Sequence, residues 1–185
     1  MEIYQPAEDS YLLSGALKKY VSKLLNNNSN LKVLDVGGGS GILAETLIKL
    51  KINPQNIILV DINPEAIKHL KKNFPNSKVI KSNLFAKVKG KFDLVVFNPP
   101  YLPNNKFDKE RDTSGGKNGD ETILRFLKKL EKHLDKNGKC FLLTSALTPM
   151  QKIEKEFKNF KSKLIARKKL FYEELFVWEI SLLSK

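Results

Sequence analysis

The sequence predicts an α/β fold: a mostly parallel seven-stranded sheet with helices on both faces and one antiparallel strand near the C-terminus. Short apolar runs of strand length alternate with segments of helical periodicity along most of the chain, as in sheets built from strand–helix–strand units. The last two apolar runs are joined near Glu173 and Glu174 by a connection too short for a crossover helix, so one of them has to run antiparallel.

The first half of the chain begins with a helix that ends before the polar stretch LLNNNSN at 24–30. Asn63 and Pro64 start a later helix, because asparagine is a common N-cap and proline suits the first helical position. The apolar runs between these segments have the length of buried strands. In chain order we predict strand 31–37, helix 40–50, strand 56–62, helix 63–74 and strand 77–82.

The second half continues the alternation and ends in a pair of strands. FDLVVFN and GKCFLLTS are apolar runs typical of buried strands, and the segments that follow them include stretches of helical periodicity. We predict strand 92–98, helix 119–134, strand 138–145, helix 150–160, and terminal strands at 162–171 and 174–183.

The bulk composition is that of one globular domain spanning residues 1–185. With 41% hydrophobic and 29% charged residues the chain can bury a core, and no apolar run approaches the roughly 20 residues that span a bilayer. The N-terminus is acidic where a secretory signal is basic, so we expect a cytoplasmic protein with no membrane partner. Cys140 lies in an apolar strand, and one cysteine with two histidines predicts no metal site.

The chain is strongly basic, with a net charge of +13 and a pI of about 9.7. Such a charge suits an acidic partner such as nucleic acid. The lysines are scattered along the sequence rather than gathered in one block, which favours solvated surfaces instead. We therefore expect that nucleic acid is not required, although the charge can assist docking onto a ribonucleoprotein or an acidic protein.

A glycine-rich turn follows the first strand, in VLDVGGGSG at 33–41. The strand delivers Asp35, and Gly37, Gly39 and Gly41 then let the backbone turn sharply and approach a ligand closely. The dinucleotide fingerprint G-x-G-x-x-G requires a further glycine where this chain has Ile42. The turn therefore predicts cofactor binding, and its spacing disfavours NAD without excluding it.

Asp61 closes the next strand, twenty residues after Gly41. A carboxylate there can accept hydrogen bonds from both hydroxyls of a ribose, or it can cap the following helix beside Asn63. The glycine turn upstream favours the ribose, so we predict that Asp61 and the neighbouring Ile62 contact a cofactor.

The strand at 92–98 ends in Asn98-Pro99-Pro100-Tyr101, at the same edge of the predicted sheet. The prolines stiffen the backbone and leave carbonyl oxygens without competing local donors. The Asn98 side-chain oxygen and the Pro99 backbone oxygen can together accept both hydrogens of one –NH2 group, and Tyr101 can pack against a planar substrate. Because a glycine turn lies upstream, these four residues predict a catalytic site rather than a simple proline turn.

In combination, these features resemble an S-adenosylmethionine-dependent methyltransferase of the Rossmann-like class I type, with the N-P-P-Y signature of amino-group methylation. More closely, the chain resembles the short archaeal and eukaryotic release-factor glutamine methyltransferases. The stretches that carry this resemblance are YQPAEDSYLL at 4–13, DINPEA at 61–66, FDLVVFNPPY at 92–101 and GGKNGDE at 115–121. The first is the most diagnostic, because N-P-P-Y is shared with adenine methyltransferases.

The resemblance implies S-adenosylmethionine as the cofactor and assigns residues to it. Asp35 and Gly37 hold its methionine part, with Ser10 close by. Asn83 and Leu84 stand where the family binds adenine, usually through an aspartate, and the Asn83 oxygen can still accept from the adenine amine.

The resemblance also assigns the substrate side of the site. Asn98 and the Pro99 carbonyl orient the substrate amide, and the helical segment 1–30 forms a lid with Glu8, Asp9 and Ser10 at the active site. The loop at 102–118 contacts the substrate.

The implied reaction is methyl transfer to the side-chain amide nitrogen of a glutamine, in the Gly-Gly-Gln motif of a class I peptide release factor. A small zinc-binding activator subunit is an expected partner. Two alternatives stay open: a methyltransferase acting on an exocyclic amine of adenine or guanine in nucleic acid, and a cofactor-binding protein without catalysis. The charge favours the first alternative, whereas the small part of the chain outside the catalytic core opposes it. An intact N-P-P-Y opposes the second.

Overall fold

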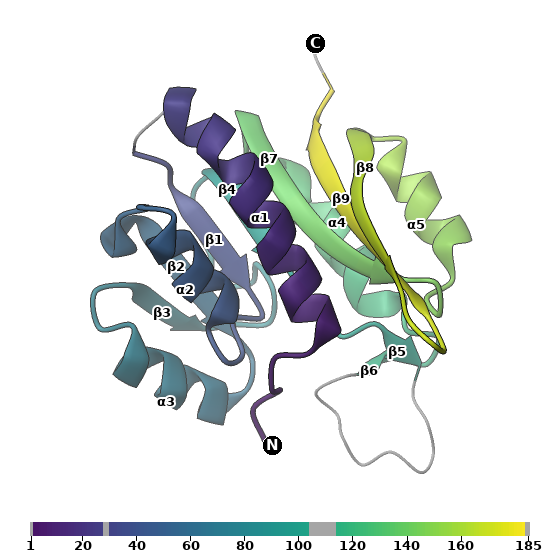
Figure 1. Ribbon diagram of the computed structural model, residues 1–185, viewed down its shortest axis with the longest axis horizontal. Helices are drawn as coiled ribbons and strands as arrows, with labels where there is room; N and C mark the ends of the chain where they lie inside the picture. The colour runs from purple at the N-terminus through teal and green to yellow at the C-terminus, as the bar shows by residue number, and fades with distance from the viewer. Residues whose placement is uncertain (1, 28–29, 104–113, 184–185) are drawn as a thin grey trace.

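The computed structural model describes residues 2–27, 30–103 and 114–183. Its centre is a seven-stranded sheet in the order β3-β2-β1-β4-β7-β9-β8 (Figure 1). The strands of this sheet are β1 (Val33–Val36), β2 (Ile57–Asp61), β3 (Lys78–Lys81), β4 (Phe92–Phe97), β7 (Leu134–Ser145), β8 (Phe160–Lys169) and β9 (Glu174–Leu182). The helices are α1 (Glu8–Asn27), α2 (Ile42–Lys49), α3 (Pro64–Asn73), α4 (Glu121–His133), α5 (Met150–Phe157) and the short 3-10 helix η1 (Pro54–Asn56).

One strand of the sheet, β9, runs against the others. It pairs antiparallel with both β7 and β8, whereas the other strand pairs of the sheet are parallel. This confirms the predicted sheet with its single antiparallel strand. β1 lies between β2 and β4, so the strand order reverses there, and open α/β sheets bind ligands outside the carboxyl ends of the strands at such a point.

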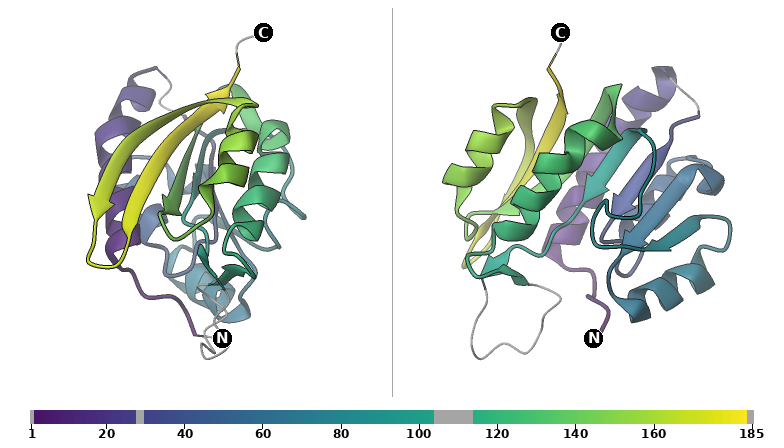
Figure 2. Two further views of the ribbon diagram at one scale, coloured as in Figure 1. Left: turned by 90° about the vertical axis from the view of Figure 1, so that its right-hand side faces the viewer. Right: turned by 180° about the vertical axis from the view of Figure 1, so that it is seen from behind.

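Helices cover both faces of the sheet, as predicted. α1 and α2 pack together on one face, and α4 and α5 lie on the opposite face, seen from behind in Figure 2. Each face buries an apolar helical stripe, with Leu13 and Leu17 of α1 and Phe126 of α4 inaccessible to solvent. No helix within the described residues is long and apolar enough to cross a bilayer.

The carboxyl end of β4, which carries the predicted catalytic residues, is fixed by the core. The ring of Phe97, the last residue of β4, packs against Phe126 on α4 with ring centres 4.6 Å apart. Both side chains are almost fully buried. Close-packed aromatic rings leave little room for movement, so Phe97 holds the backbone in place at the residue that precedes Asn98.

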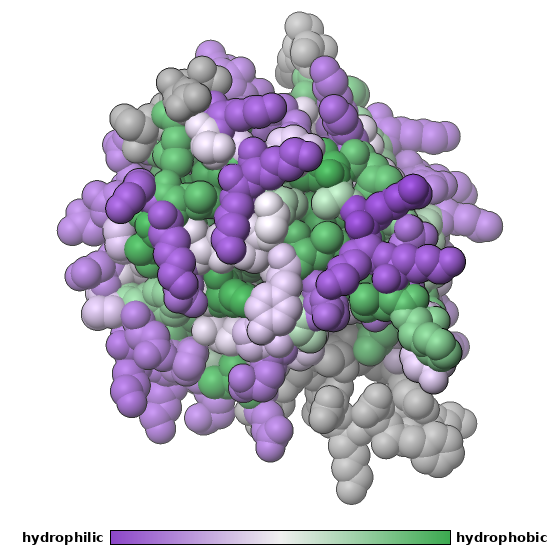
Figure 3. Space-filling view, viewed as in Figure 1, coloured by the Kyte–Doolittle hydropathy of each residue, from purple (hydrophilic) through white to green (hydrophobic). Residues whose placement is uncertain are grey.

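On the face that carries α1, hydrophilic side chains are interspersed with hydrophobic ones (Figure 3). The hydrophilic side chains are spread over the whole view rather than collected in one region. This distribution agrees with the scattered positions of the lysines in the sequence.

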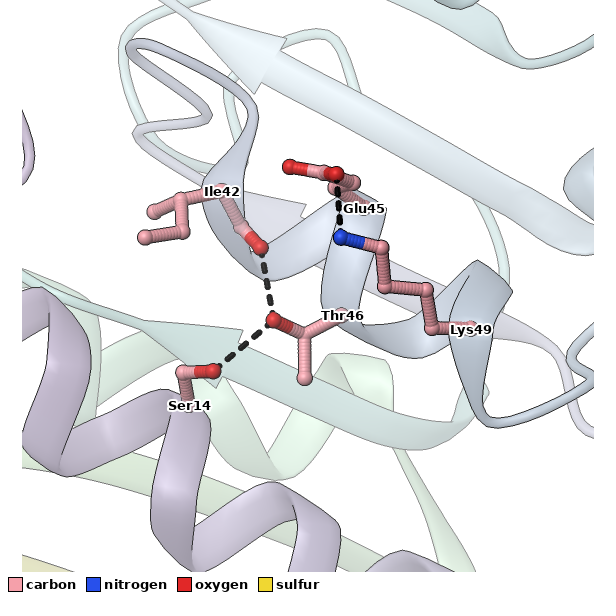
Figure 4. Close-up of polar contacts among 5 residues, drawn as sticks. All are labelled: Ser14, Ile42, Glu45, Thr46 and Lys49. Carbon is pink, nitrogen blue, oxygen red and sulfur yellow. Dashed lines mark hydrogen bonds and ion pairs between the residues drawn. The ribbon is translucent and has the colours of Figure 1, made fainter.

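A buried hydrogen bond joins α1 to α2 (Figure 4). The hydroxyl of Thr46 donates to the carbonyl oxygen of Ile42, one turn earlier in α2, at 2.8 Å. Because that contact uses its only hydroxyl hydrogen, the hydroxyl of Ser14 on α1 must donate to Thr46 Oγ1, also at 2.8 Å. Glu45 and Lys49 form an exposed ion pair elsewhere on α2. α1 is thus held to the helix that follows the glycine turn.

β7 is longer than predicted, because it begins at Leu134, directly after α4, rather than at residue 138. Its pairing with β4 shifts register between Phe92 and Leu94, so Leu134 pairs with Phe92 and the next pair is Leu94 with Lys139. Asp135, Lys136 and Asn137 in the shifted stretch are polar, and a polar stretch gives no strand signal. The prediction of a break before residue 138 was therefore wrong.

A small second sheet was not predicted. β5 (Leu102–Pro103) and β6 (Ser114–Gly116) pair in parallel. They bracket the expected substrate loop, whose residues 104–113 lie outside the described part of the chain. Proline in β5 and two glycines in β6 are poor strand formers, so composition did not indicate this pair.

Candidate active site

A cleft with a volume of about 310 Å³ opens beside the ends of β1, β2 and β4, where the strand order reverses. Its size lies within the range of pockets that bind cofactors and small substrates. The lining residues are Ile3, Tyr4, Asp9, Ser10, Val36, Gly37, Gly38, Gly39, Ser40, Ile42, Leu43, Val60, Asp61, Ile62, Asn63, Ala66, Ser82, Asn83, Leu84, Phe97, Asn98, Pro99, Pro100, Tyr101, Leu102, Thr122 and Arg125.

The glycine turn forms one wall of the cleft. Gly37 and Gly39 have φ values of +69° and +50°, which residues other than glycine rarely adopt. The N–H groups of Gly37 and Gly38 both donate to the carbonyl oxygen of Val60, at 2.7 and 2.9 Å. The turn is therefore tied to the end of β2 while its backbone stays in contact with the cleft.

Asp61 joins the glycine turn to the start of α3. One carboxylate oxygen accepts from the N–H of Gly39 at 2.9 Å, and the other accepts from the N–H of Asn63 at 2.8 Å. Asn63 is the predicted N-cap, and its side chain accepts from the N–H of Glu65 at 3.0 Å. Each carboxylate oxygen has about two acceptor positions, so Asp61 can accept further hydrogen bonds from a ligand in the cleft.

Two of the predicted cofactor residues, Asp35 and Gly41, do not line the cleft. Asp35 is fully buried in β1, and neither carboxylate oxygen has a hydrogen-bond partner among the described residues. Burial, followed by the negative charge of Asp61, raises the pKa of Asp35 to about 8. Gly41 has φ +84° at the start of α2, where a Cβ would lie 2.2 Å from the ring of Phe74.

Asn83 and Leu84 line the cleft from the turn after β3. The hydroxyl of Ser82 donates to the carbonyl oxygen of Leu84 at 3.0 Å and accepts from the N–H of Lys87 at 2.9 Å. These bonds hold Leu84 at φ +50°, an uncommon conformation for leucine. The Asn83 side chain is exposed and so remains accessible to a ligand.

Asp9, in the first turn of α1, is the hydrogen-bonding centre of the cleft. Its carboxylate accepts from the hydroxyl of Tyr4 at 3.0 and 3.1 Å, from the side-chain amide of Asn98 at 3.1 Å and from the hydroxyl of Tyr101 at 3.4 Å. Asp9 is only 3% exposed. The surrounding donors therefore replace the water that a buried carboxylate loses.

The contact with Asp9 determines which way the Asn98 amide faces. An ionised carboxylate only accepts hydrogen bonds, so the amide nitrogen of Asn98 is directed to Asp9 and the amide oxygen is directed elsewhere. Asn98 Oδ1 is shielded from solvent and has no hydrogen-bond partner among the described residues. Leaving such an oxygen unpaired costs free energy. It is therefore an acceptor with unused capacity in a residue that lines the cleft.

Tyr4 and Tyr101 are kept as hydrogen-bond donors. Burial, followed by the charge of Asp9, raises the pKa of both hydroxyls above their usual value of about 10. Both side chains stay protonated at neutral pH, so neither can act as a base there.

The structure brings most of the predicted site residues into one cleft: Ser10, Gly37, Gly39, Asp61, Ile62, Asn83, Leu84, Asn98, Pro99, Pro100 and Tyr101. Of the lid residues that the resemblance places at the active site, Asp9 and Ser10 line the cleft, whereas Glu8 does not. The resemblance did not indicate the hydrogen bonds that Asp9 makes, and it gave Tyr4 no role in the site. Thr122 and Arg125 reach the cleft from α4, and only helical periodicity marked that segment.

The fold and the site together define a class of protein. A mostly parallel sheet with β9 inserted antiparallel between β7 and β8, a glycine turn after β1 and a carboxylate ending β2 are the features of a Rossmann-like class I methyltransferase. A family model described as the methyltransferase small domain matches residues 17–172. The chain belongs to this family and is a methyltransferase.

Individual relatives agree with this assignment. A protein of Methanocaldococcus jannaschii, provisionally named a protein N5-glutamine methyltransferase, is 38% identical over 95% of this chain and 90% of its own length. Methyltransferase HEMK2 of Mus musculus is 31% identical over 85% of this chain and 78% of its own.

Among solved structures, a chain of the E. cuniculi Mtq2–Trm112 complex, described as responsible for methylation of the eRF1 translation termination factor, superposes with a TM-score of 0.76. The match covers 99% of this chain and 100% of that one at 24% identity, which shows a common fold.

Proposed function

We propose that this protein transfers a methyl group from S-adenosylmethionine to the side-chain amide nitrogen of a glutamine, in the Gly-Gly-Gln motif of a class I peptide release factor. The observation that carries the proposal is the orientation of Asn98, whose amide nitrogen is held by Asp9 so that Oδ1 is left as an acceptor. The names of the relatives support glutamine as the substrate group. A translation factor as substrate would place the reaction in the cytoplasm.

The cleft fits S-adenosylmethionine. At Gly37 and Gly39, which have positive φ angles, one wall of the cleft is backbone without side chains, so a cofactor can approach it closely. Next to this wall, the Asp61 carboxylate can accept further hydrogen bonds from ribose hydroxyls. Asn83 and Leu84 would receive the adenine, and Ser10 would lie near the methionine part. When bound, the cofactor supplies an activated methyl group on a sulfonium centre.

The chain's own residues would position the acceptor nitrogen. The Asn98 side-chain oxygen and the Pro99 backbone oxygen would each accept one hydrogen of the substrate –NH2 group. These two contacts would fix the plane of the amide and stabilise the positive charge that develops on its nitrogen as the methyl group is transferred. One of the two nitrogen-bound hydrogens would then leave to solvent as a proton, so that the methylated amide is neutral. Tyr101, held by Asp9, would flank the amide. Neither Cys140, which is buried in the core, nor a covalent intermediate is needed.

A small activator subunit is a further part of the proposal. The structural relative from E. cuniculi was solved as a complex of Mtq2 with Trm112. By resemblance, a zinc-binding partner of this kind would cover apolar surface near the cofactor. Co-purification with and without such a subunit, followed by activity measurement, tests this point.

The net charge of +13 favours one other candidate, a methyltransferase acting on an exocyclic amine of a nucleic-acid base. The same pair of acceptors would grip a flipped-out adenine or guanine. Incubation with labelled-methyl cofactor and either release factor, tRNA, rRNA or DNA separates the two candidates. Label in the release factor supports the proposal, and label in nucleic acid alone contradicts it.

The first test of the site is Asn98→Ala in the same assay. We expect the variant to lose most methyl transfer, because one of the two acceptors for the substrate –NH2 is gone, while its cofactor affinity stays within a few-fold of wild type. Calorimetry measures the affinity and tritiated methyl measures the transfer. Near-wild-type turnover would falsify the assignment.

A further inference from the structure

The turn between β8 and β9 presents two aromatic side chains to solvent. Phe171 is 90% exposed and Tyr172 is 86% exposed, and their rings meet edge to face with centres 4.6 Å apart. Hairpin turns favour glycine, asparagine, aspartate or proline, so turn geometry does not account for two adjacent rings. Burial in the core does not account for them either. Adjacent exposed aromatic residues are typical of a surface that binds another molecule.

This aromatic turn is fixed in place beside the active site. The hydroxyl of Ser145, at the end of β7, donates to the Glu173 carboxylate, and the N–H of Leu170 donates to the Glu173 carbonyl oxygen at 2.8 Å. Lys168, just before the turn, pairs with Glu8 in the first turn of α1. Glu8 precedes Asp9, so the hairpin is tied to the helical turn that lines the cleft. Figure 1 shows the tip of the hairpin near this end of α1.

A shallow groove of about 340 Å³ continues from the hairpin between α1 and β8. It is mainly apolar, and Figure 3 shows hydrophobic side chains on this face among hydrophilic ones. Tyr11, 58% exposed, stands in its wall. The groove is lined by Tyr11, Leu12, Gly15, Ala16, Lys19, Tyr20, Ile165, Ala166 and Lys168.

The charges around the aromatic turn favour a polypeptide over a nucleic acid as the occupant. Lys168 pairs with Glu8, and Arg167 lies 4.0 Å from the carboxylate of Glu174. Glu173 adds a further negative charge at the turn. Two of the three cationic side chains at 167–169 are thus matched by carboxylates. Of the two lysines that line the groove, Lys168 is one of these, and Lys19 lies over the ring of Tyr20 with Nζ 5.6 Å from its centre. This leaves little excess positive charge for phosphates.

We infer that the aromatic turn and the adjoining groove dock the polypeptide of the protein substrate that flanks the methylated glutamine. This inference rests on the proposed function. A glutamine side chain that enters the cleft must bring its own main chain across the rim, and the aromatic turn and groove extend from that rim. Rigid aromatic side chains supply contact area there at a low cost in conformational entropy.

The test compares a Phe171→Ala/Tyr172→Ala double variant with wild type on two substrates, an intact class I release factor and a short peptide limited to Gly-Gly-Gln with blocked ends, which lacks the flanking polypeptide. For the intact protein we expect KM to rise at least tenfold with kcat within twofold. Turnover of the short peptide, cofactor affinity and the melting temperature should not change, because neither side chain touches the cleft. The matched control is Leu183→Ala, which removes another exposed hydrophobic residue just beyond the far end of β9 and should leave KM unchanged.

The outcomes separate this inference from the proposed function. An unchanged KM for the intact protein, with an active wild type, would overturn the docking surface alone. Equal losses on the intact protein and the peptide would also overturn it, because the turn would then act on the cleft itself. If the wild type methylated RNA but neither protein substrate, and the double variant lost that activity, the surface would be a base-stacking platform and both proposals would fail.

Discussion

At the scale of single residues, Asp9 sets the orientation of the Asn98 side-chain amide. Its carboxylate accepts a hydrogen bond from the side-chain amide nitrogen of Asn98 and so directs that nitrogen towards Asp9. The hydroxyls of Tyr4 and Tyr101 donate to the same carboxylate. Asp9 does not itself contact the substrate in the proposed mechanism, so it is a positioning residue. Its effect should therefore differ from that of Asn98, which is proposed to contact the –NH2 group directly.

We expect Asp9→Asn to lower kcat by about 10- to 100-fold, because an amide at position 9 can donate as well as accept and no longer dictates the orientation of Asn98. Cofactor affinity should stay within about threefold. Single-turnover methyl transfer and calorimetry measure the two effects. Glu65→Gln, which removes an exposed carboxylate on α3, is the control for loss of charge. Unaltered kcat in the Asp9 variant would show that the amide is held by other means.

Asp61 has two roles: it is the proposed acceptor for the ribose hydroxyls, and it accepts hydrogen bonds that hold the glycine turn and the start of α3. Asp61→Ala removes the acceptor for the Gly39 and Asn63 N–H groups together with the proposed ribose acceptor. We therefore expect S-adenosylmethionine to bind at least tenfold more weakly, with a smaller effect on kcat at saturating cofactor. Isothermal titration measures the affinity. An affinity equal to that of wild type would exclude the ribose role.

At the scale of elements, the contact between α1 and α2 places Asp9 relative to the glycine turn. Thr46→Val leaves the buried Ser14 hydroxyl without its acceptor, and we expect a loss of about 1–3 kcal/mol in the free energy of unfolding. Ser14→Ala should cost less, about 1 kcal/mol, because Thr46 still donates to Ile42. Urea unfolding measures both.

The exposed pair beside this contact supplies the control. Glu45 and Lys49 are more than half exposed, so Lys49→Ala should change the free energy of unfolding by no more than about 0.5 kcal/mol. A double variant of Ser14 and Thr46 should lose less than the sum of the single losses, since the two share one interaction. Additive losses would mean that the hydroxyls do not interact.

The elements also show where sequence reasoning succeeds and fails. Buried strands and amphipathic helices repeat a pattern that one sequence displays, so the seven strands, their single antiparallel member and the Asn63 cap were predictable. β5 and β6 were not, because their pairing depends on tertiary context rather than on strand-forming residues. The resemblance placed Asp9 at the active site, but its hydrogen bond to Asn98 could not be foreseen. An acid in the first turn of a helix already has a local explanation, and Asn98 lies 89 residues away.

At the scale of the whole molecule, Asp35 should make stability depend on pH. Its pKa is raised from 3.8 to about 8 by burial and by Asp61, so between these values the folded protein retains a proton that the unfolded chain has released. Stability contributed at this residue is therefore greatest at low pH and is lost progressively as the pH rises towards 8. Each unit of pKa shift corresponds to about 1.4 kcal/mol, so the full penalty amounts to several kcal/mol.

Asp35→Asn removes this ionisation while keeping the shape of the side chain. We expect the variant to melt at a higher temperature than wild type at pH 8.5, and the difference to shrink as the pH is lowered towards 4. Thermal unfolding of the cofactor-free protein across this range measures the effect. Parallel curves for the two proteins would show that Asp35 is not the titrating group.

The hydrogen bonds that converge on Asp9 have a kinetic consequence. The first turn of α1 and the end of β4 lie 89 residues apart in the chain, so we expect the contact between them to form more slowly than the local contacts of helical turns. Secondary structure can form before this contact is made. The Asn98 side-chain oxygen and the Pro99 backbone oxygen, in contrast, cannot be aligned for the substrate until Asp9 has reached Asn98. During refolding from urea, methyl transfer should thus recover in step with tertiary fluorescence and later than far-ultraviolet circular dichroism, so that the enzyme's own turnover acts as a clock for the docking of its first helix.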